Sequence, residues 1–454
     1  MKTEFMKLFV FVMLLAIMSC ASTGVEEPSR RSQTSDNGIS VTQKKQIGQF
    51  NVYRPQANWP LNDEQLSLVR RLNTFSFSLF RMIQDDDKSR VFSPLSLAYA
   101  MGMTGLGCNG LPLKELNDAL GLAANDTTSL HDLMASLMAG LPRVDEKVEL
   151  DIANAFYMNS HRDDVEVNPD YQEALLNAYK ADCKALDFSQ SSTLDYINEW
   201  CRIQTNNFIP KVIERLDESY ISCLLNALYF KGDWTTPFPS DFTREWTFTR
   251  EDGSETKVPM MNSLEPIGLD YAEDELCQAL RMPYATGRFG MTILLPKKGH
   301  TTSEVLDALN GERLAEISKK MDNEDVYVQI PSFETKVTTQ LIEPLAKMNL
   351  TSWFYGDNLL GMIQDHNGTP HGVSIVEAFQ VARIKVNEKG TEAAAVTVFA
   401  YTDKAALREP KEFRADHPFV YLITERSSGA VLFVGTYHGE PSGSTETGIQ
   451  PIRM

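Results

Sequence analysis

The sequence has no apolar run long enough to cross a membrane and no surplus of positive charge. Its longest hydrophobic stretch, Leu8 to Met18, is about half the length that a membrane-spanning helix needs. The 43 Lys and Arg residues face 61 Asp and Glu residues, which gives a formal net charge of -18. This charge opposes binding to phosphate backbones, so we expect no nucleic-acid partner. We interpret the acidic surplus as a solvated surface.

The motifs of common enzymes are also missing. None of the seven histidines stands in a metal-ligand spacing such as H-E-x-x-H, and neither G-x-S-x-G nor a glycine-rich nucleotide loop occurs. Asp416 precedes His417, but neighbouring residues of a strand point to opposite faces, so we interpret this pair as structural. The sequence therefore predicts no metal site, no cofactor and no enzyme.

Cysteine is scarce, with six residues in the chain. Apart from Cys20 they stand at positions 108, 183, 201, 223 and 277, an odd number without the paired spacing of zinc or redox motifs. A domain with a large core needs no disulfide bonds. We therefore expect buried thiols.

The chain contains no Gly-, Ser- and Pro-rich break after residue 60. Hydrophobic residues make up 43% of it and charged residues 23%, which is typical of a globular protein. These features predict one large domain over residues 61–440, followed by a C-terminal tail over residues 441–454.

The N-terminus has the plan of a secretory signal over residues 1–20, because Lys2 and Lys7 precede the short apolar run and Ser19 and Cys20 follow it. Its end, from Ile17 to Cys20, resembles a bacterial lipoprotein box. That resemblance implies that Cys20 is acylated and that a lipid anchor alone holds the protein at a membrane, in the periplasm or at the cell surface. The alternative is secretion, with cleavage near Ser22. The polar residues 21–60 are expected to form a flexible tether.

Within residues 61–440, helical and strand-like patterns are mixed. Asn62 with Gln65 predicts a capped helix start, followed by an apolar face made of Leu68, Leu72, Phe75, Leu79 and Met82. Asn168 and Pro169 predict a second helix, running toward Asp182. Strand-like runs are 291–295, 326–330, 420–424 and 430–435. The order of these elements favours an α+β fold with largely antiparallel sheets.

The stretch from Val386 to Phe399 is strand-like but rich in small residues. In an extended conformation one face would be formed only by uncharged residues, namely Thr391, Ala393, Ala395, Thr397, Phe399 and Tyr401. Gly390 permits a hinge before them. The segment is therefore suited to becoming an interior strand. Taken alone, it also fits an edge strand or an alanine-rich helix start capped by Thr391.

Several segments resemble, in order along the chain, the motifs of one family. These segments are Phe92 to Leu97, Asn226 to Trp234, Val258 to Met261, Leu280 to Tyr284, Asp416 to Phe419 and Gly429 to Gly435. Together with Val386 to Phe399 they resemble the serpins, suicide-type proteinase inhibitors. The hinge signature comprises Glu388, Gly390, Thr391, Glu392, Ala393, Ala394 and Ala395. The resemblance implies helices with three β-sheets and an exposed reactive loop that inserts into the large central sheet.

The resemblance further implies an inhibitor that traps serine proteases as covalent acyl-enzymes. Counting from Glu388 places the reactive bond between Lys404 and Ala405, and a lysine there fits a trypsin-like protease. Tyr401, Ala405 or Arg408 are alternatives for the residue that is attacked. We expect a monomer with target proteases as its partners. The alternative is a non-inhibitory binding or chaperone-like protein of the same fold, whereas the missing motifs disfavour a hydrolase.

The resemblance also identifies residues that control opening of the central sheet. Ser93, Ser96 and Asn226 match its polar shutter, and Trp234 matches the tryptophan at the breach, where the loop first enters the sheet. Gln380 departs from the family, which usually has a histidine there, and a glutamine keeps hydrogen bonding without titrating. Ordinary buried packing is the alternative for each of these five residues.

Overall fold

The structure is a computed structural model that describes residues 61–84, 87–391, 409–440 and 445–446. The first helix, α1 (Asp63–Ile83), confirms the predicted start: the Asn62 side chain accepts from the Gln65 backbone, and the Gln65 side chain accepts from the Asn62 backbone. The predicted apolar face is buried at Leu68, Leu72, Phe75 and Leu79. Met82 is 51% exposed, so the buried face stops one turn before the helix ends.

The second predicted helix is α5 (Pro169–Tyr179). The side chain of Asn168 accepts a hydrogen bond from the backbone of Asp170, and Pro169 occupies the first turn. The helix ends at Tyr179, short of the predicted Asp182, because Lys180 adopts the left-handed conformation at a φ of 51°.

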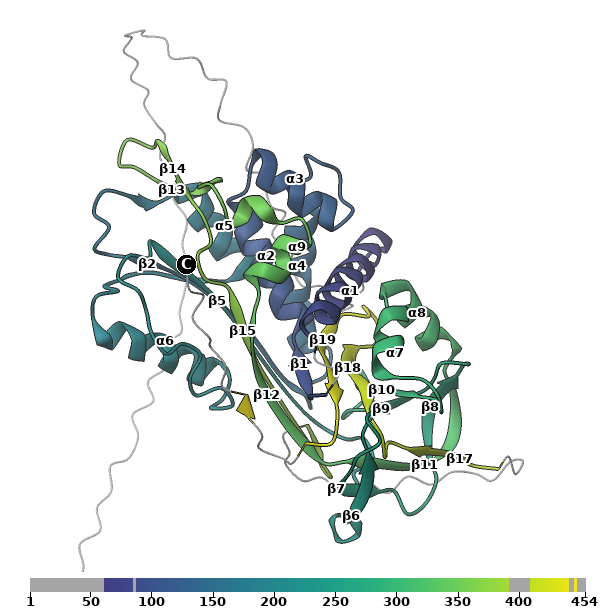
Figure 1. The fold of residues 1–454 in the computed structure, drawn as a ribbon. Helices are drawn as coiled ribbons and strands as arrows, with labels where there is room; N and C mark the ends of the chain where they lie inside the picture. Colours follow the sequence, from purple (N-terminus) through teal and green to yellow (C-terminus); the bar gives the residue numbers. More distant parts are fainter. Residues whose placement is uncertain (1–60, 85–86, 392–408, 441–444, 447–454) are drawn as a thin grey trace, which may run out of the picture. The chain divides into compact units, whose positions relative to one another are not determined.

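A seven-stranded sheet forms the centre of the fold (Figure 1). Its strands, in spatial order, are β20 (Thr445–Glu446), β12 (Phe333–Gln340), β15 (Phe379–Asn387), β16 (Gly390–Thr391), β5 (Ser222–Asp233), β2 (Glu149–Asn159) and β4 (Asp182–Leu186). The pairs β12/β20 and β2/β4 are parallel and the other pairs are antiparallel.

Two further sheets complete the strands of the described residues. A ten-stranded sheet has the order β1 (Arg90–Phe92), β19 (Val431–Tyr437), β18 (Phe419–Glu425), β10 (Phe289–Pro296), β9 (Cys277–Pro283), β8 (Ile267–Glu273), β11 (Asp322–Pro331), β7 (Glu255–Asn262) and β6 (Arg244–Thr249), with β17 (Lys411–Arg414) beside β11. A small sheet has the order β14 (Pro370–Val373), β13 (Leu359–Gln364) and β3 (Glu166–Val167). The predicted strand runs lie in β10, β11, β18 and β19, except that β19 begins one residue later than predicted, and the α+β prediction is confirmed.

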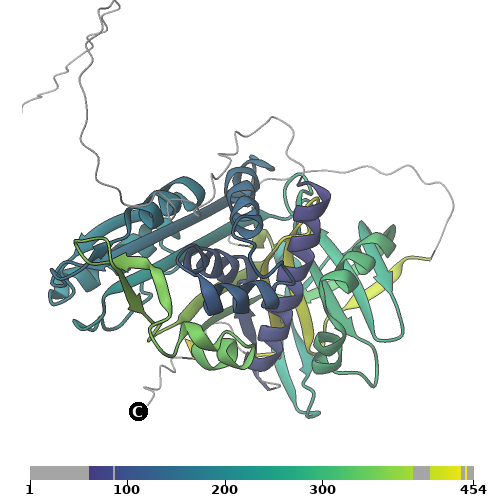
Figure 2. The same cartoon turned by 90° about the horizontal axis from the view of Figure 1, so that it is seen from above.

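Alternation along the central strands separates two cores. In β5, Leu225 and Ala227 pack with α6 (Ser191–Gln204), whereas Leu228 and Phe230 belong to the larger core on the other face. In the turned view, the strands lie between α6 and the group of helices that includes α2 (Figure 2). The remaining helices are α2 (Pro94–Leu106), α3 (Gly110–Ala119), α4 (Ser129–Gly140), α7 (Thr302–Ala308), α8 (Gly311–Lys320) and α9 (Ile342–Lys347).

A buried histidine joins two helices of the larger core. His131 of α4 is 5% exposed, and its Nδ1 lies 2.6 Å from the hydroxyl of Tyr179 at the end of α5. Burial raises the pKa of Tyr179 well above its ordinary value, so the hydroxyl keeps its proton and donates to a neutral imidazole. Burial lowers the pKa of His131 to about 4, against an opposing effect of Asp126.

This depressed pKa predicts a loss of stability in mild acid. Between about pH 6.5 and pH 4 the unfolded chain protonates His131 and the folded chain does not, so the free energy of unfolding should fall by ~3 kcal/mol across that window. Urea unfolding at a series of pH values measures the effect. The variant His131→Gln lacks the titrating group and should show a flatter profile; a profile as steep as that of the wild type would contradict the assignment.

Candidate functional site

In the described part of the chain, the strands β15 and β5 of the central sheet have backbone pairing in common only with the two-residue strand β16. Thr391 of β16 lies opposite Val386 of β15 and opposite Gly232 of β5. Beyond this point, over residues 379–385 and 222–231, no ladder joins β15 to β5 in the described part of the chain. The predicted hinge therefore begins as a strand in the position where the loop is expected to enter.

Glycine is required where the chain turns into this position. Gly390 has a φ of 157°, and a Cβ atom there would lie 2.2 Å from the carbonyl oxygen of Gly232 and 2.7 Å from Cα of Asp233. Any side chain would meet backbone atoms that have no room to move. The hinge that the sequence predicts at Gly390 is thus also a close approach between two backbones.

An aromatic pair contacts β16 and the turn that leads into it. The rings of Trp234 and Tyr284 stack with centroids 4.4 Å apart, and Trp234 donates from Nε1 to the Asn387 carbonyl and from its backbone to the Lys389 carbonyl. The Tyr284 hydroxyl lies 2.6 Å from Oγ1 of Thr391, which is 3% exposed. Thr391 therefore points inward, as the alternation predicts. Sequence reasoning placed Tyr284 in a family motif but assigned it no role here.

Glu388 is tied to the segment that follows β5. Its backbone carbonyl accepts from the Phe238 backbone at 2.8 Å, and its carboxylate accepts from the Thr243 hydroxyl at 2.6 Å. The turn between β15 and β16 is therefore held from outside as well as by its own strand pairing.

Polar residues predicted to act as a shutter meet between the two strands. The Ser93 backbone donates to Oε1 of Gln380 at 2.7 Å, and Nε2 of Gln380 donates to the Ser93 carbonyl at 3.0 Å. The Ser93 hydroxyl donates to the Leu432 carbonyl at 2.8 Å. Glutamine thus makes a two-point contact between β15 and the start of α2, which keeps the hydrogen bonding that the sequence led us to expect.

The same network reaches β5 and then β2. The hydroxyl of Ser96 donates to Oδ1 of Asn226, and Nδ2 of Asn226 donates to Oδ1 of Asn154 at 2.8 Å. Asn154 in turn donates to the Tyr179 carbonyl at 2.8 Å. Ser93, Ser96, Asn226 and Gln380 are brought together, with Asn154 as a member that the sequence gave no reason to single out. Their role in opening the sheet stays a prediction.

The opposite face of the sheet carries a brace across β15 and β5. Arg383 of β15 donates to the Phe208 carbonyl at 2.7 Å, and its guanidinium carbon lies 4.6 Å from the centre of the Phe208 ring. The Phe208 ring also packs edge-on against Tyr229 of β5, with centroids 6.1 Å apart. The segment after α6 therefore contacts both strands, a link that local sequence patterns did not reveal.

The expectation that Asp416 and His417 point apart is wrong. Nδ1 of His417 lies 3.0 Å from the Asp416 carboxylate, and Nε2 lies 2.9 Å from the Pro296 carbonyl. Both residues lie in the loop between β17 and β18, where strand alternation does not apply. Burial lowers the pKa of His417, but hydrogen bonds to these acceptors raise it overall. Both ring nitrogens thus face acceptors within the protein, and the structural role of the pair stays a prediction.

Other candidate chemistry is sparse in the described chain. All five cysteines there are free: Cys108, Cys201 and Cys277 are buried, and Cys183 and Cys223 are partly buried. Among the residues that the structure describes, no group of His, Cys, Asp or Glu side chains could hold a metal ion. Within the same ranges, no helix is both long and apolar enough to span a membrane.

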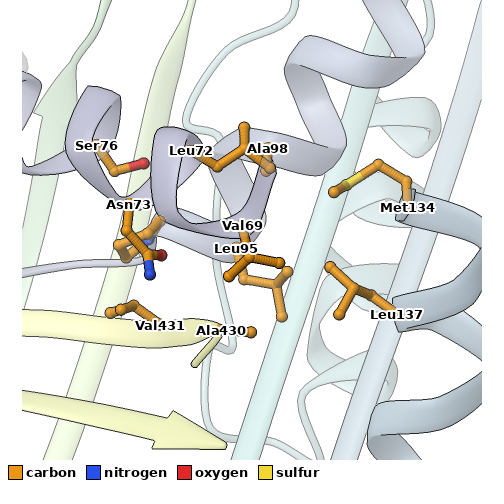
Figure 3. Close-up of a pocket in the computed structure, with 11 residues that line it drawn as sticks. Val69, Leu72, Asn73, Ser76, Leu95, Ala98, Met134, Leu137, Ala430 and Val431 are labelled. Carbon is orange, nitrogen blue, oxygen red and sulfur yellow. The ribbon is translucent and has the colours of Figure 1, made fainter. Parts of the chain in front are cut away.

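A small hollow lies between α1, α2, α4 and β19 (Figure 3). Its volume is about 20 Å³, and apolar side chains such as Leu72 and Leu137 line it together with Asn73 and Ser76. Because a single water molecule needs about 10–15 Å³, this hollow has no room for a substrate.

Part of the predicted site lies outside the described residues. These residues are Cys20, Glu392, Ala393, Ala394, Ala395, Lys404 and Ala405. Their assignments stay predictions.

Comparison with known proteins gives one consistent result. The family model described as "Serpin (serine protease inhibitor)" matches residues 70–439. An uncharacterised serpin-like protein of Thermococcus kodakarensis is 30% identical over 383 residues, covering 82% of this chain and 85% of the relative. The leukocyte elastase inhibitor of Xenopus laevis is 29% identical, covering 80% and 97%. The native structure of the thermophilic serpin tengpin is similar with a TM-score of 0.73 and 27% identity, covering 85% of this chain and 97% of tengpin.

Proposed function

Because this chain belongs to the serpin family, we propose that it is a suicide inhibitor of serine proteases, of trypsin-like specificity. The observation that carries the proposal is the position of β16. Gly390 and Thr391 pair with β15 on one side and with β5 on the other, as the first residues of an additional central strand would. Some relatives are named as protease inhibitors.

In the proposed reaction, the serine hydroxyl of the protease attacks the carbonyl carbon of Lys404. The peptide bond to Ala405 breaks, Ala405 leaves with a new amino group, and Lys404 stays esterified to the serine. The hinge then continues into the sheet behind Thr391 and draws the attached protease along. Displacement of the catalytic serine from its oxyanion donors would prevent hydrolysis of the ester.

Three features of the described residues support insertion at this point. The contacts of Trp234 and Tyr284 hold the first residues of the strand in place. The inward position of Thr391 gives Ala393 and Ala395 the same direction, if the strand continues with period two. The shutter and the brace each bind β15 and β5 from opposite faces, and both would have to yield as the strands separate.

We further propose that the protein is exported and held at a membrane through Cys20. The support is the lipoprotein-like end of the apolar run and the polar stretch of residues 21–60. A tether of this length would let the inhibitor domain reach proteases in the surrounding solution.

Thr391→Arg should turn the inhibitor into a substrate. An arginine at this buried position would be desolvated and unpaired beside Tyr284. Loop insertion would therefore become slower than hydrolysis of the acyl-enzyme ester. Titration of trypsin, followed by denaturing gels, should show about tenfold or more inhibitor cleaved per protease trapped. Lys389→Arg, at an exposed neighbouring position, is the control. An unchanged yield of the covalent complex in Thr391→Arg would refute the insertion route.

Cleavage of the loop should raise thermal stability. The freed segment can then complete the strand between β15 and β5 and pair its backbone with both. Calorimetry before and after cleavage should detect the rise, at roughly 1–2 °C per kcal/mol for a chain of this size. A melting temperature that stays level or falls would favour the non-inhibitory alternative.

Lys404→Ala should slow association with trypsin by about tenfold or more, because the ammonium group pairs with the carboxylate in the specificity pocket. Elastase-like proteases, which accept small residues, should be inhibited as well or better. Mass spectrometry of the released peptide locates the bond. A fragment that starts at Ala405 supports Lys404, and one that starts at Glu409 assigns the bond to Arg408 instead.

A further inference from the structure

The outer edge of the central sheet lies at β12, and the end of the chain pairs with it. On the inner side, all eight residues of β12 pair with β15. On the outer side, Lys336 lies opposite Thr445 and Val337 lies opposite Glu446, in a parallel pairing with β20. Within the described ranges, β20 is the only strand that pairs with this outer side.

An outer strand of this kind can bind other chains. Its outward N–H and C=O groups are donors and acceptors that a further extended segment can pair with, and natural sheets cover or interrupt such edges. β12 has no proline, and its pairing with β15 runs through all eight positions without a bulge. The strand is therefore a regular template along its whole length.

The chain is held in place up to Glu440, beside the start of β12. Ser89 donates from its backbone and from its hydroxyl to the Glu440 carboxylate, and the Tyr437 hydroxyl donates to the Glu440 carbonyl at 3.3 Å. The ring centroids of Tyr437 and Phe333, the first residue of β12, lie 4.7 Å apart. The last residues of the chain therefore continue from a fixed point next to the start of β12.

The reach and the direction of these last residues agree with the pairing. The five steps from Glu440 to Thr445 can span about 17 Å. The three steps along β12 from Phe333 to Lys336 cover about 10 Å. A segment that sets out beside Phe333 thus reaches Lys336 easily, and it then runs in the same direction as β12, as the parallel pairing requires.

The sequence after β20 also suits this position. If the register continues, residues 447–449 would lie beside residues 338–340, where β12 ends. Pro451 comes two residues later, at a point where a proline no longer interrupts the pairing. The matched part of the family model ends at residue 439, so β20 is a feature of this chain beyond that match.

We propose that residues 441–454 form an edge strand that covers the outer side of β12 and keeps a second copy of this chain from pairing there. Two uncovered β12 edges could pair with each other about a twofold axis, because an antiparallel pair of identical strands is self-complementary. The proposal does not rest on the inhibitory function, since β12 and β15 separate β20 from β16.

Hydrogen exchange of the full-length protein, at a dilution where it is monomeric, tests the cover. Thr445→Pro combined with Glu446→Pro removes both backbone N–H groups of β20 and should prevent its pairing. The amides of residues 334–340 should then exchange about tenfold faster or more than in the wild type, as read by mass spectrometry.

Ser442→Pro combined with Ser444→Pro is the matched control, because it places two prolines just before β20. This control should exchange as the wild type does. The amides of β4, at the opposite edge of the sheet, should exchange at the same rate in all three proteins, which shows that the sheet is intact. Unchanged exchange at residues 334–340 in the variant with prolines in β20 overturns the cover.

Light scattering at rising protein concentration tests the second half of the proposal. The variant with prolines in β20 should form dimers, whereas the wild type and the control should stay monomeric. Exchange at residues 334–340 of this variant should become slow again as the dimer forms, because the β12 edges then pair with each other. A variant that stays monomeric, or dimers in which these amides still exchange fast, would overturn the role of the cover against a second copy.

Discussion

The pairing of two residues, Gly390 and Thr391, between β15 and β5 is the constraint on which the rest of the central sheet depends. A strand edge inside a sheet carries backbone donors and acceptors that must be paired. Here β16 pairs with only one end of β15 and of β5. Along the rest of these two strands, no ladder joins them in the described chain. The proposed insertion requires this arrangement, because an added strand would pair with both edges. The side chains around the site either hold the first residues of that strand or bind its two neighbours.

The contacts that these side chains make differ with their position along the two strands. At the occupied end, Trp234 and Tyr284 bind backbone and side-chain groups of the turn, so the start of the strand is fixed. Further along the strands, the contacts are made to β15 and β5 themselves. At the start of α2, Ser93 forms a hydrogen bond with Gln380 of β15, and Ser96 forms one with Asn226 of β5. Because these hydrogen bonds lie on one face and the Phe208 contacts lie on the other, separation of β15 from β5 has to break both sets. The proposed insertion would therefore take the sheet between two discrete packings rather than through a continuous range of openings.

The sequence alone predicted the elements that local chemistry determines. Capping by Asn62, the helix start at Asn168 and the inward direction of Thr391 follow from neighbours within a few residues, and the structure has all three. It could not predict contacts between distant segments. Arg383 and Phe208 are 175 residues apart, and Tyr284 and Thr391 are 107 apart. The error at Asp416 has a different, local origin, because strand alternation does not apply to residues that lie in a loop. Family resemblance, and not local periodicity, singled out Ser93, Ser96 and Asn226, which belong to one hydrogen-bond network in the structure, and their role in opening the sheet stays a prediction.

Two glycines inside strands show what composition alone does not reveal. Gly390 is needed because the Gly232 backbone lies where a Cβ atom would go, whereas at Gly290 of β10 that position lies 2.7 Å from Nε of Arg281 on β9. In the first case the missing side chain lets one strand enter beside another, and in the second it lets a guanidinium lie across a strand. Both positions stand inside sheets, where glycine otherwise weakens a strand. A glycine that is retained inside a strand despite this weakening therefore points to whatever occupies the space that its side chain leaves free.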